Sequence, residues 1–207
     1  RTVRGPGSRP GAMKRLVLAS HNAGKLAELR DLLGGRGIEV VAQDVFGIGE
    51  IEETGLSFVE NALLKARHAA TISGLPALAD DSGLCVEALA GAPGLHSARY
   101  AGGAGDAQAN MDKLLKALKQ VPETQRQAHF HCSLVLLRHP QDPAPIVCEG
   151  RWHGRILDAP RGTGGFGYDP IFLDVASGRS AAELSRTEKA AISHRGKALT
   201  QLLAALT

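Results

Sequence analysis

The sequence predicts an α/β protein with one mixed β-sheet and helices on both of its faces. Short apolar runs of strand length alternate with segments in which leucines recur at helical spacing. Two central runs, residues 129–138 and 146–156, are separated only by the proline-rich segment 139–145, which is typical of antiparallel neighbours. The sheet is therefore expected to be mixed rather than purely parallel.

The chain begins with a predicted strand, a tight polar loop and a helix. The run RLVLAS at 15–20 is short and apolar, and it stops at the polar segment HNAGK. The helix that follows ends at Gly34-Gly35, and its apolar positions are Leu26, Leu29, Leu32 and Leu33. A second strand is predicted at 38–43, followed by an acidic, glycine-containing loop at 47–55.

A capping box predicts where the second helix begins. Ser57 followed by Glu60 satisfies the first backbone N–H groups of a helix, which is expected to run from Phe58 to about Thr71. The apolar run LPALA at 75–79 is the third predicted strand, and Asp80-Asp81-Ser82-Gly83 follows directly at its carboxyl end. Residues 91–106 are rich in glycine and are expected to be irregular.

The second half of the chain is predicted to hold a helix from Asn110 to about Val121, the two central strands and a final helix. Segment 161–170 contains too many glycines for either regular element. A second capping box, Ser185 with Glu188, precedes the last helical region. On one ideal helix Lys189 could not share a face with His194 and Arg195, so a break between them is expected.

Composition narrows the class of protein. The 207 residues include 24 Lys and Arg against 21 Asp and Glu, and the excess is accounted for by three arginines within residues 1–12. Residues 1–12 are predicted to be a tag or a disordered extension, and 13–207 a single domain. A nucleic-acid-binding face is not supported, and no apolar run approaches the roughly 18 residues of a membrane span. Three cysteines without CxxC spacing favour a reducing cytoplasm over a disulfide or zinc framework.

The loop after the first strand is the first candidate site. Ser20, His21, Asn22, Ala23, Gly24 and Lys25 lie between a strand and a helix, where backbone N–H groups and the positive end of the helix favour an anion. Lys25 adds a full charge. The segment is not a Walker A motif, because Ala19 and Leu26 replace its required glycine and Ser/Thr. An ordinary strand–helix turn remains the alternative.

Adjacent acids form the second candidate site. Asp80 and Asp81 follow an apolar run, and successive strand residues point to opposite faces, so only one of them should face a given site. Mg²⁺ takes one or two carboxylates together with waters and substrate phosphates. The acidic loop with Glu52 and Glu53 could supply a second carboxylate, or could be a solvated charge run.

Two further segments are candidates for nucleotide contacts. Residues 162–170 combine glycines, which let a backbone approach a ligand closely, with Phe166 and Tyr168, which offer a stacking surface. Segment 189–197 gathers Lys, His and Arg side chains, which suit phosphate or carbonyl oxygens. Small core residues under a loop and a solvated basic helix face are the respective alternatives.

Taken together, the chain resembles the inosine/xanthosine triphosphate pyrophosphatase family. The resemblance rests on six segments in order, from residue 14 to the C-terminus: SHNAGK, EETGLSFVENALLKARHAA, ADDSGL, GAPGLHSARYAG, GTGGFGYDPIF and ELSRTEKAAISHRGKAL. His21 departs from the commonest form of the first segment, which should matter little if the backbone makes the contacts.

The resemblance implies a two-lobed α/β fold with a long mixed sheet and a central nucleotide cleft, usually in a homodimer. It implies Mg²⁺-dependent hydrolysis of ITP, dITP and XTP to the monophosphate and diphosphate. Asp81 would be the metal-associated general base, and Glu52 the second metal carboxylate, with Glu53 as its alternative. The substrate-binding residues would be Ser20, His21, Asn22, Ala23, Gly24, Lys25, Ser82, Phe166, Gly167, Tyr168, Asp169, Lys189, His194 and Arg195.

Two other functions compete with this interpretation. A Maf-like pyrophosphatase would perform the same reaction on other nucleotides and would lack the SHRG segment. A non-catalytic nucleotide-binding module would keep the glycine-rich loops without needing the acids. Asp81 together with the acidic loop favours an enzyme.

Overall fold

The structure is a computed structural model that describes residues 13–103 and 105–206. The prediction of a tag or extension at 1–12 falls outside these residues. The described part contains one seven-stranded sheet in the order β2-β1-β3-β4-β5-β6-β7. Its strands are β1 (Arg15–Ala19), β2 (Glu39–Ala42), β3 (Ala77–Val86), β4 (Gln127–Leu137), β5 (Ile146–Ile156), β6 (Phe172–Asp174) and β7 (Arg179–Ser180).

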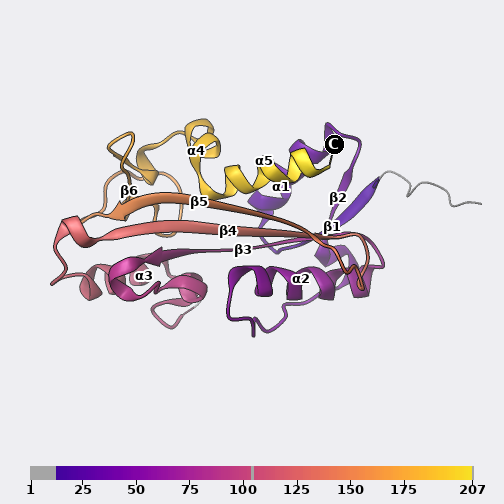
Figure 1. The fold of residues 1–207 in the computed structure, drawn as a ribbon, viewed down its shortest axis with the longest axis horizontal. Helices are drawn as coiled ribbons and strands as arrows, with labels where there is room; N and C mark the ends of the chain where they lie inside the picture. The colour runs from indigo at the N-terminus through magenta and orange to yellow at the C-terminus, as the bar shows by residue number, and fades with distance from the viewer. Residues whose placement is uncertain (1–12, 104, 207) are drawn as a thin grey trace, which may run out of the picture.

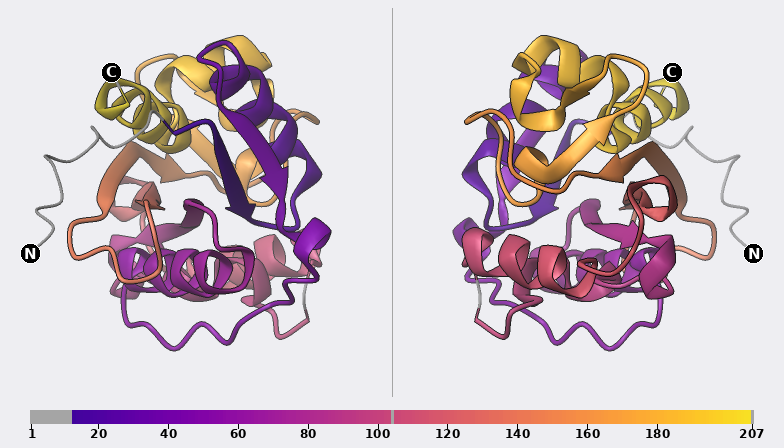
Figure 2. Two further views of the ribbon diagram at one scale, coloured as in Figure 1. Left: turned by 90° about the vertical axis from the view of Figure 1, so that its right-hand side faces the viewer. Right: turned by 90° about the vertical axis from the view of Figure 1, so that its left-hand side faces the viewer.

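The sheet is mixed, as the sequence predicts. β1 pairs in parallel with β2 and β3, whereas every pair from β3 to β7 is antiparallel. Helices cover both faces, with α2 and α3 on one side and α1, α4 and α5 on the other (Figure 1). Figure 2 shows the same layers from the two ends of the sheet. The helices are α1 (Ala23–Gly34), α2 (Phe58–Ser73), α3 (Ala107–Ala117), α4 (Arg186–Ile192) and α5 (His194–Ala205).

Local sequence signals mark the helix ends as expected. Ser57 Oγ accepts the backbone N–H of Glu60 at the start of α2, and Ser185 forms a complete capping box with Glu188 at the start of α4. The expected break after Lys189 is confirmed: α4 ends at Ile192, and Ser193 caps α5 by accepting the N–H of Gly196. Each cap satisfies an N–H group that has no partner inside its helix.

Three sequence predictions need correction. Asp80–Gly83 lie inside β3 and not beyond its end, because β3 pairs with β4 from Ala77 to Val86. Segment 91–106 is not wholly irregular, since Gly94–Arg99 form a 3₁₀ helix, η3. The helix predicted from Asn110 to about Val121 is α3, which begins three residues earlier and ends at Ala117. The short strands β6 and β7 are too brief to give a periodic pattern.

Two buried apolar clusters pack the helices that carry the candidate residues against the sheet. Leu16, Leu18 and Leu78 of the sheet pack with Leu29 of α1 and Leu199 of α5. On the opposite face, the alanines of α2 pack against a row of small and branched strand residues: Val17, Ala77, Ala79, Val135 and Leu137. Both faces are filled by buried apolar side chains, so packing fixes the positions of α1, α2 and α5 relative to β3. No helix in the described ranges is long and apolar enough to cross a membrane.

Candidate active site

β3 has an open edge beyond Ala79. β1 pairs with β3 only from Val17↔Ala77 to Ala19↔Ala79 and then turns into the loop before α1. Within the described residues, the next contact on that edge is the N–H of Leu84, which Ser97 Oγ accepts at 2.9 Å. Asp80, Asp81 and Ser82 therefore lie on a strand whose β1 side no other strand covers. Side chains from both faces of the sheet can reach this edge.

The loop from Ser20 to Lys25 stands beside that edge and begins α1. Asn22 is the N-cap: its Oδ1 accepts the N–H of Lys25 at 3.0 Å, and its own N–H donates to Ser20 Oγ at 3.2 Å. The N–H groups of Ala23 and Gly24 open the helix, where helix geometry supplies no partner. His21 is turned to Asp44, at 2.9 Å between Nδ1 and Oδ1. This helix start can accept an anion through its backbone.

Lys25 forms an ion pair with Asp80, whose side chain is 3% exposed. Burial opposes ionisation of Asp80, but the positive charges of Lys25 and Arg195 outweigh it and hold the pKa of Asp80 below its ordinary value. Arg195 itself pairs with Glu28 of α1 at 3.2 Å. One face of β3 thus carries a cluster, Lys25, Asp80 and Arg195, in which each basic group already has an acidic neighbour.

The other face carries a second cluster around Asp81. Lys65 Nζ of α2 donates to Asp81 Oδ1 at 3.0 Å and to Glu53 Oε1 at 3.1 Å. Asn61 Nδ2 lies 3.5 Å from Asp81 Oδ2, and Arg99 Nη1 lies 3.5 Å from Glu53 Oε2. Burial raises the pKa of Asp81 despite the Lys65 ammonium. Lys65 retains a raised pKa because Asp81 and Glu53 together outweigh its own burial.

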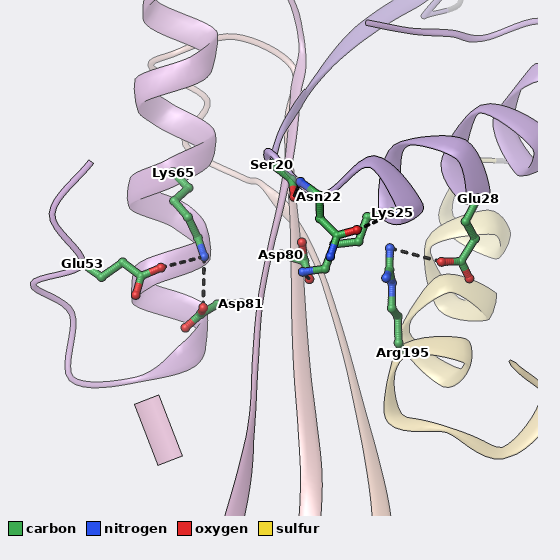
Figure 3. Close-up of polar contacts among 9 residues, drawn as sticks. All are labelled: Ser20, Asn22, Lys25, Glu28, Glu53, Lys65, Asp80, Asp81 and Arg195. Atoms are coloured by element: carbon green, nitrogen blue, oxygen red, sulfur yellow. Dashed lines mark hydrogen bonds and ion pairs between the residues drawn. The ribbon is translucent and has the colours of Figure 1, made fainter. Parts of the chain in front are cut away.

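Figure 3 shows the two clusters on opposite sides of β3, with Ser20 and Asn22 above the strand. The sequence-based expectation that Asp80 and Asp81 face different ways is confirmed by their partners, Lys25 and Lys65. Only Asp81 shares a cluster with an acid of the 50–54 loop. That acid is Glu53, whereas the neighbouring Glu52 is exposed and no described residue pairs with it.

Buried polar atoms without hydrogen-bond partners gather near the first cluster. Within residues 13–103 and 105–206 they include Ser82 Oγ, which interacts only with the weakly polar Cys132 thiol, His194 Nδ1 and Arg195 Nε. Ser82 faces Cys132 across β3 and β4, and Cys132 faces Gly150 across β4 and β5. A Cβ on Gly150 would lie 1.8 Å from the carbonyl oxygen of His194, so this glycine allows α5 to approach the sheet. Native proteins rarely leave such atoms unsatisfied, so water or a polar ligand is expected to satisfy them.

His194 is half-buried at the start of α5. It stacks on Phe130 with ring centroids 4.9 Å apart, and burial together with Lys189 and Arg195 lowers its pKa to about 3. The unfolded chain would protonate this histidine below about pH 6.5, whereas the folded protein would not. Protonation therefore favours the unfolded state, and stability is lost as pH falls from about 6.5 towards 3.

Replacing His194 should reduce that loss. Between pH 7 and pH 5 the free energy of unfolding is expected to fall by about 1–2 kcal/mol less in His194→Gln than in the unmodified protein. Urea denaturation at the two pH values measures this difference, with the exposed His139→Gln as the matched substitution. Equal pH dependence in the unmodified protein and His194→Gln would contradict the lowered pKa of His194.

The glycine-rich loop at 162–170 presents one aromatic ring and buries the other. Phe166 is 74% exposed, and Lys189 Nζ lies 4.9 Å from the centre of its ring. Lys189 also pairs with the buried Asp169, whose Oδ2 accepts the N–H of Phe166 at 2.8 Å. Tyr168 is buried, with a pKa raised by burial, and its hydroxyl donates to Ser97 O at 2.8 Å. Phe166 is thus the aromatic residue of this loop that can stack on a ligand.

Sequence reasoning missed Lys65, Asn61 and Arg99. Asn61 and Lys65 are four residues apart, so they share a face of α2, and a polar pair on a helix otherwise rich in alanine was a usable signal. Arg99 had no such signal, because its partner Glu53 is distant in sequence. In the part of the chain that the structure describes, no three His, Cys, Asp or Glu side chains are arranged to hold a metal by themselves.

Known proteins resemble this chain along almost its full length. The model of the Ham1 family matches residues 16–205. A dITP/XTP pyrophosphatase of Shigella flexneri is 60% identical over 194 residues, covering 94% of this chain and 98% of the relative. The protein of the same name from Escherichia coli (strain K12) is 58% identical over 194 residues. This alignment also covers 94% of this chain and 98% of the relative.

Solved structures of similarly named proteins have the same fold as this chain. A HAM1 protein from Coxiella burnetii superposes with a TM-score of 0.90 at 52% identity, covering 94% of this chain and 98% of that structure. A nucleoside-triphosphatase, also named dITP/XTP pyrophosphatase, from Mycobacterium abscessus gives a TM-score of 0.79 at 46% identity. It covers 91% of this chain and 98% of that structure.

Proposed function

The chain belongs to the Ham1 family, and from this premise we propose that it is a Mg²⁺-dependent pyrophosphatase of non-canonical purine nucleoside triphosphates. Its substrates would be ITP, dITP and XTP. Water would add across the anhydride bond between the α- and β-phosphates, giving the nucleoside monophosphate and diphosphate. Removal of such nucleotides from the cellular pool is the corresponding role.

The observation that carries this proposal is the pair of charged clusters on either side of the open β3 edge. One cluster holds Lys25 and Arg195 beside the start of α1, and the other holds Asp81 with Lys65. Phosphoryl transfer needs positioning, charge neutralisation and a base, with little covalent help from the protein. A cationic helix start and a carboxylate placed at the same strand edge meet these needs.

The phosphate chain would lie against the Ser20–Lys25 loop. The N–H groups at the start of α1 and the Lys25 ammonium would bind phosphate oxygens, while Asn22 holds the loop in the required conformation. His21 would contribute through its backbone, since its ring pairs with Asp44. This explains why a histidine is compatible with this position.

Asp81 would be the general base that orients the attacking water and accepts its proton. Lys65 and Asn61 fix the position of its two oxygens, so the carboxylate can orient a water, and a bound Mg²⁺ would keep it ionised. Asp80 points to the opposite face and neutralises Lys25, so we assign the base to Asp81 alone.

The acidic residues fit a hard divalent cation. Asp81 and Glu53 both contact the Lys65 ammonium, so two carboxylates already converge on one positive charge, and Glu52 is an exposed acid next to Glu53 in the sequence. Asp81 with Glu52, or with Glu53 in its place, would hold Mg²⁺, which completes its shell with waters and phosphates. When bound, the ion offsets phosphate charge.

The purine would lie between α5 and the glycine-rich loop. Phe166 offers an exposed ring for stacking, with Gly167 beside it, and Lys189 is held next to that ring by Asp169. The unpartnered atoms of Ser82, His194 and Arg195 would receive the polar groups of the nucleotide. Tyr168 would support the loop from below through its bond to Ser97 O.

We also propose a cytoplasmic homodimer. The three cysteines, Cys85, Cys132 and Cys148, are free thiols, which suits a reducing compartment. Light scattering after size-exclusion chromatography measures the mass in solution, where a dimer of the 21.7 kDa chain would give about twice that mass.

The test of the proposed function is diphosphate release from dITP across a range of Mg²⁺ concentrations. Release that requires Mg²⁺ and yields dIMP and diphosphate in equal amounts would support the proposal. Release of single phosphates would indicate a different reaction. Binding of dITP without turnover at any Mg²⁺ concentration would indicate a non-catalytic nucleotide-binding module.

Substitutions in the acidic loop identify the second metal carboxylate. Glu52→Gln is expected to raise the Mg²⁺ concentration needed for half-maximal activity by about tenfold, because one of two carboxylate ligands is lost. Glu53→Gln is the matched variant on the neighbouring residue. A larger shift in Glu53→Gln would transfer the role to Glu53.

A further inference from the structure

The 3₁₀ helix η3, Gly94–Arg99, is fixed against the strand that carries Asp81. Ser97 Oγ accepts the N–H of Leu84 at 2.9 Å and donates to Gly94 O at 2.6 Å, while Tyr168 donates to Ser97 O at 2.8 Å. A Cβ on Gly83 would lie 2.4 Å from Gly94 O, so the two backbones are in close contact. These contacts fix the backbone of η3, and Arg99 is its last residue.

Arg99 is held next to the proposed base by a single acidic residue. Its Nη1 lies 3.5 Å from Glu53 Oε2, and the other oxygen of Glu53 accepts Lys65, which also donates to Asp81. The Arg99 side chain is 47% exposed, and among the described residues Glu53 is the acid that pairs with it. Most of its five N–H donors are thus free for another anion.

The charged side chains around the β3 edge leave little positive charge for the phosphates of a substrate. Lys25 is neutralised by Asp80, Arg195 is paired with Glu28, and Lys65 is shared between two carboxylates. Without Arg99, these groups carry one more negative than positive charge. A nucleoside triphosphate brings about four further negative charges, of which Mg²⁺ offsets two. The acids of the site compete with the phosphates for the same lysines.

We propose that Arg99 binds the phosphate chain of the substrate and the diphosphate product. This inference rests on the proposed function. A guanidinium presents two parallel N–H groups that match two phosphate oxygens, whereas lysine offers a point charge. Glu53 keeps Arg99 close to the β3 edge, and the exposed part of the guanidinium faces the incoming anion.

The test measures diphosphate binding by isothermal titration calorimetry in the presence of Mg²⁺, which requires no turnover. Arg99→Ala is expected to weaken diphosphate binding at least tenfold and to lower kcat/KM for dITP at least tenfold. Arg99→Lys should recover part of each loss, because it restores the charge without the planar fork. Arg15→Ala is the matched control, since Arg15 has the same 47% exposure and pairs with Glu39 at 3.1 Å, and it should stay within twofold.

The diphosphate and dITP measurements test the role of Arg99 and the proposed function separately. Unchanged diphosphate affinity in Arg99→Ala, with melting temperature equal to that of the unmodified protein, would overturn the role of Arg99 even if dITP hydrolysis is confirmed. Full recovery by Arg99→Lys would remove the argument for paired N–H donors. Failure of the unmodified protein to hydrolyse dITP would overturn the proposed function, while the diphosphate measurement would still report on Arg99.

Discussion

Asp81→Asn is expected to lower kcat for dITP hydrolysis by at least about 100-fold, the typical contribution of a positioned general base. The amide keeps the shape of the carboxylate but cannot accept a proton from water and is a poor ligand for Mg²⁺. Folding should be retained, because Lys65 keeps its contact with Glu53 and the substitution removes a charge that burial disfavours. Steady-state kinetics at saturating Mg²⁺ measures the effect.

The control for this variant is Asp112→Asn at an exposed position of α3, where the carboxylate accepts a hydrogen bond from Gln108. Its kcat should equal that of the unmodified protein. Near-normal kcat in Asp81→Asn would remove the assignment of the base to this residue. A melting temperature well below that of the unmodified protein would require the same measurement in Asp81→Glu, which retains a carboxylate.

Substrate selectivity is the second large expected effect. The keto oxygen at position six of hypoxanthine and xanthine accepts hydrogen bonds, whereas the amino group of adenine donates them. Arg195 has only donors, and no described residue accepts a hydrogen bond from its buried Nε. A site built around such a hydrogen bond can reject the wrong partner by up to about 10⁴. We therefore expect kcat/KM for ITP, dITP and XTP to exceed that for ATP by a large factor.

His194 refines this expectation. With a pKa of about 3 its ring is neutral, so it carries one donor and one acceptor nitrogen and can pair with either group. Discrimination between a keto oxygen and an amino group therefore depends mainly on Arg195, which has only donors. Arg195→Ala should therefore narrow the ratio of kcat/KM between ITP and ATP, with Arg15→Ala as the control for loss of a surface arginine. GTP shares the keto oxygen, so its expected rejection depends on the surroundings of position two.

Comparison of kcat/KM across ITP, dITP, XTP, GTP and ATP provides the measurement. Ribose and deoxyribose forms should be used equally well, since no residue of the site is assigned to a 2′-hydroxyl. Equal use of ATP and ITP by the unmodified protein would contradict both the donor argument and the proposed substrate class. An unchanged ratio in Arg195→Ala would leave the substrate class intact and place the discrimination elsewhere.

The sequence alone determined the features that depend on neighbours along the chain. The capping residues Ser57 and Ser185, the break at Ser193 and the opposite facing of Asp80 and Asp81 follow from helix and strand geometry over a few residues. The short connection between the two central strands predicted their antiparallel pairing, and with it a mixed sheet. Six ordered segments then indicated the family, although they did not show how their residues meet.

Only the tertiary structure decided which side chains share a cluster. The contacts Lys65–Asp81, Arg99–Glu53 and Tyr168–Ser97 join residues from different elements, and β3 extends through Asp80–Gly83 because β4 supplies its hydrogen bonds. Such partners depend on how α2, η3 and the glycine-rich loop pack around β3, which local patterns do not encode. Packing of distant segments therefore places the candidate base, its lysine and the additional arginine at one strand edge.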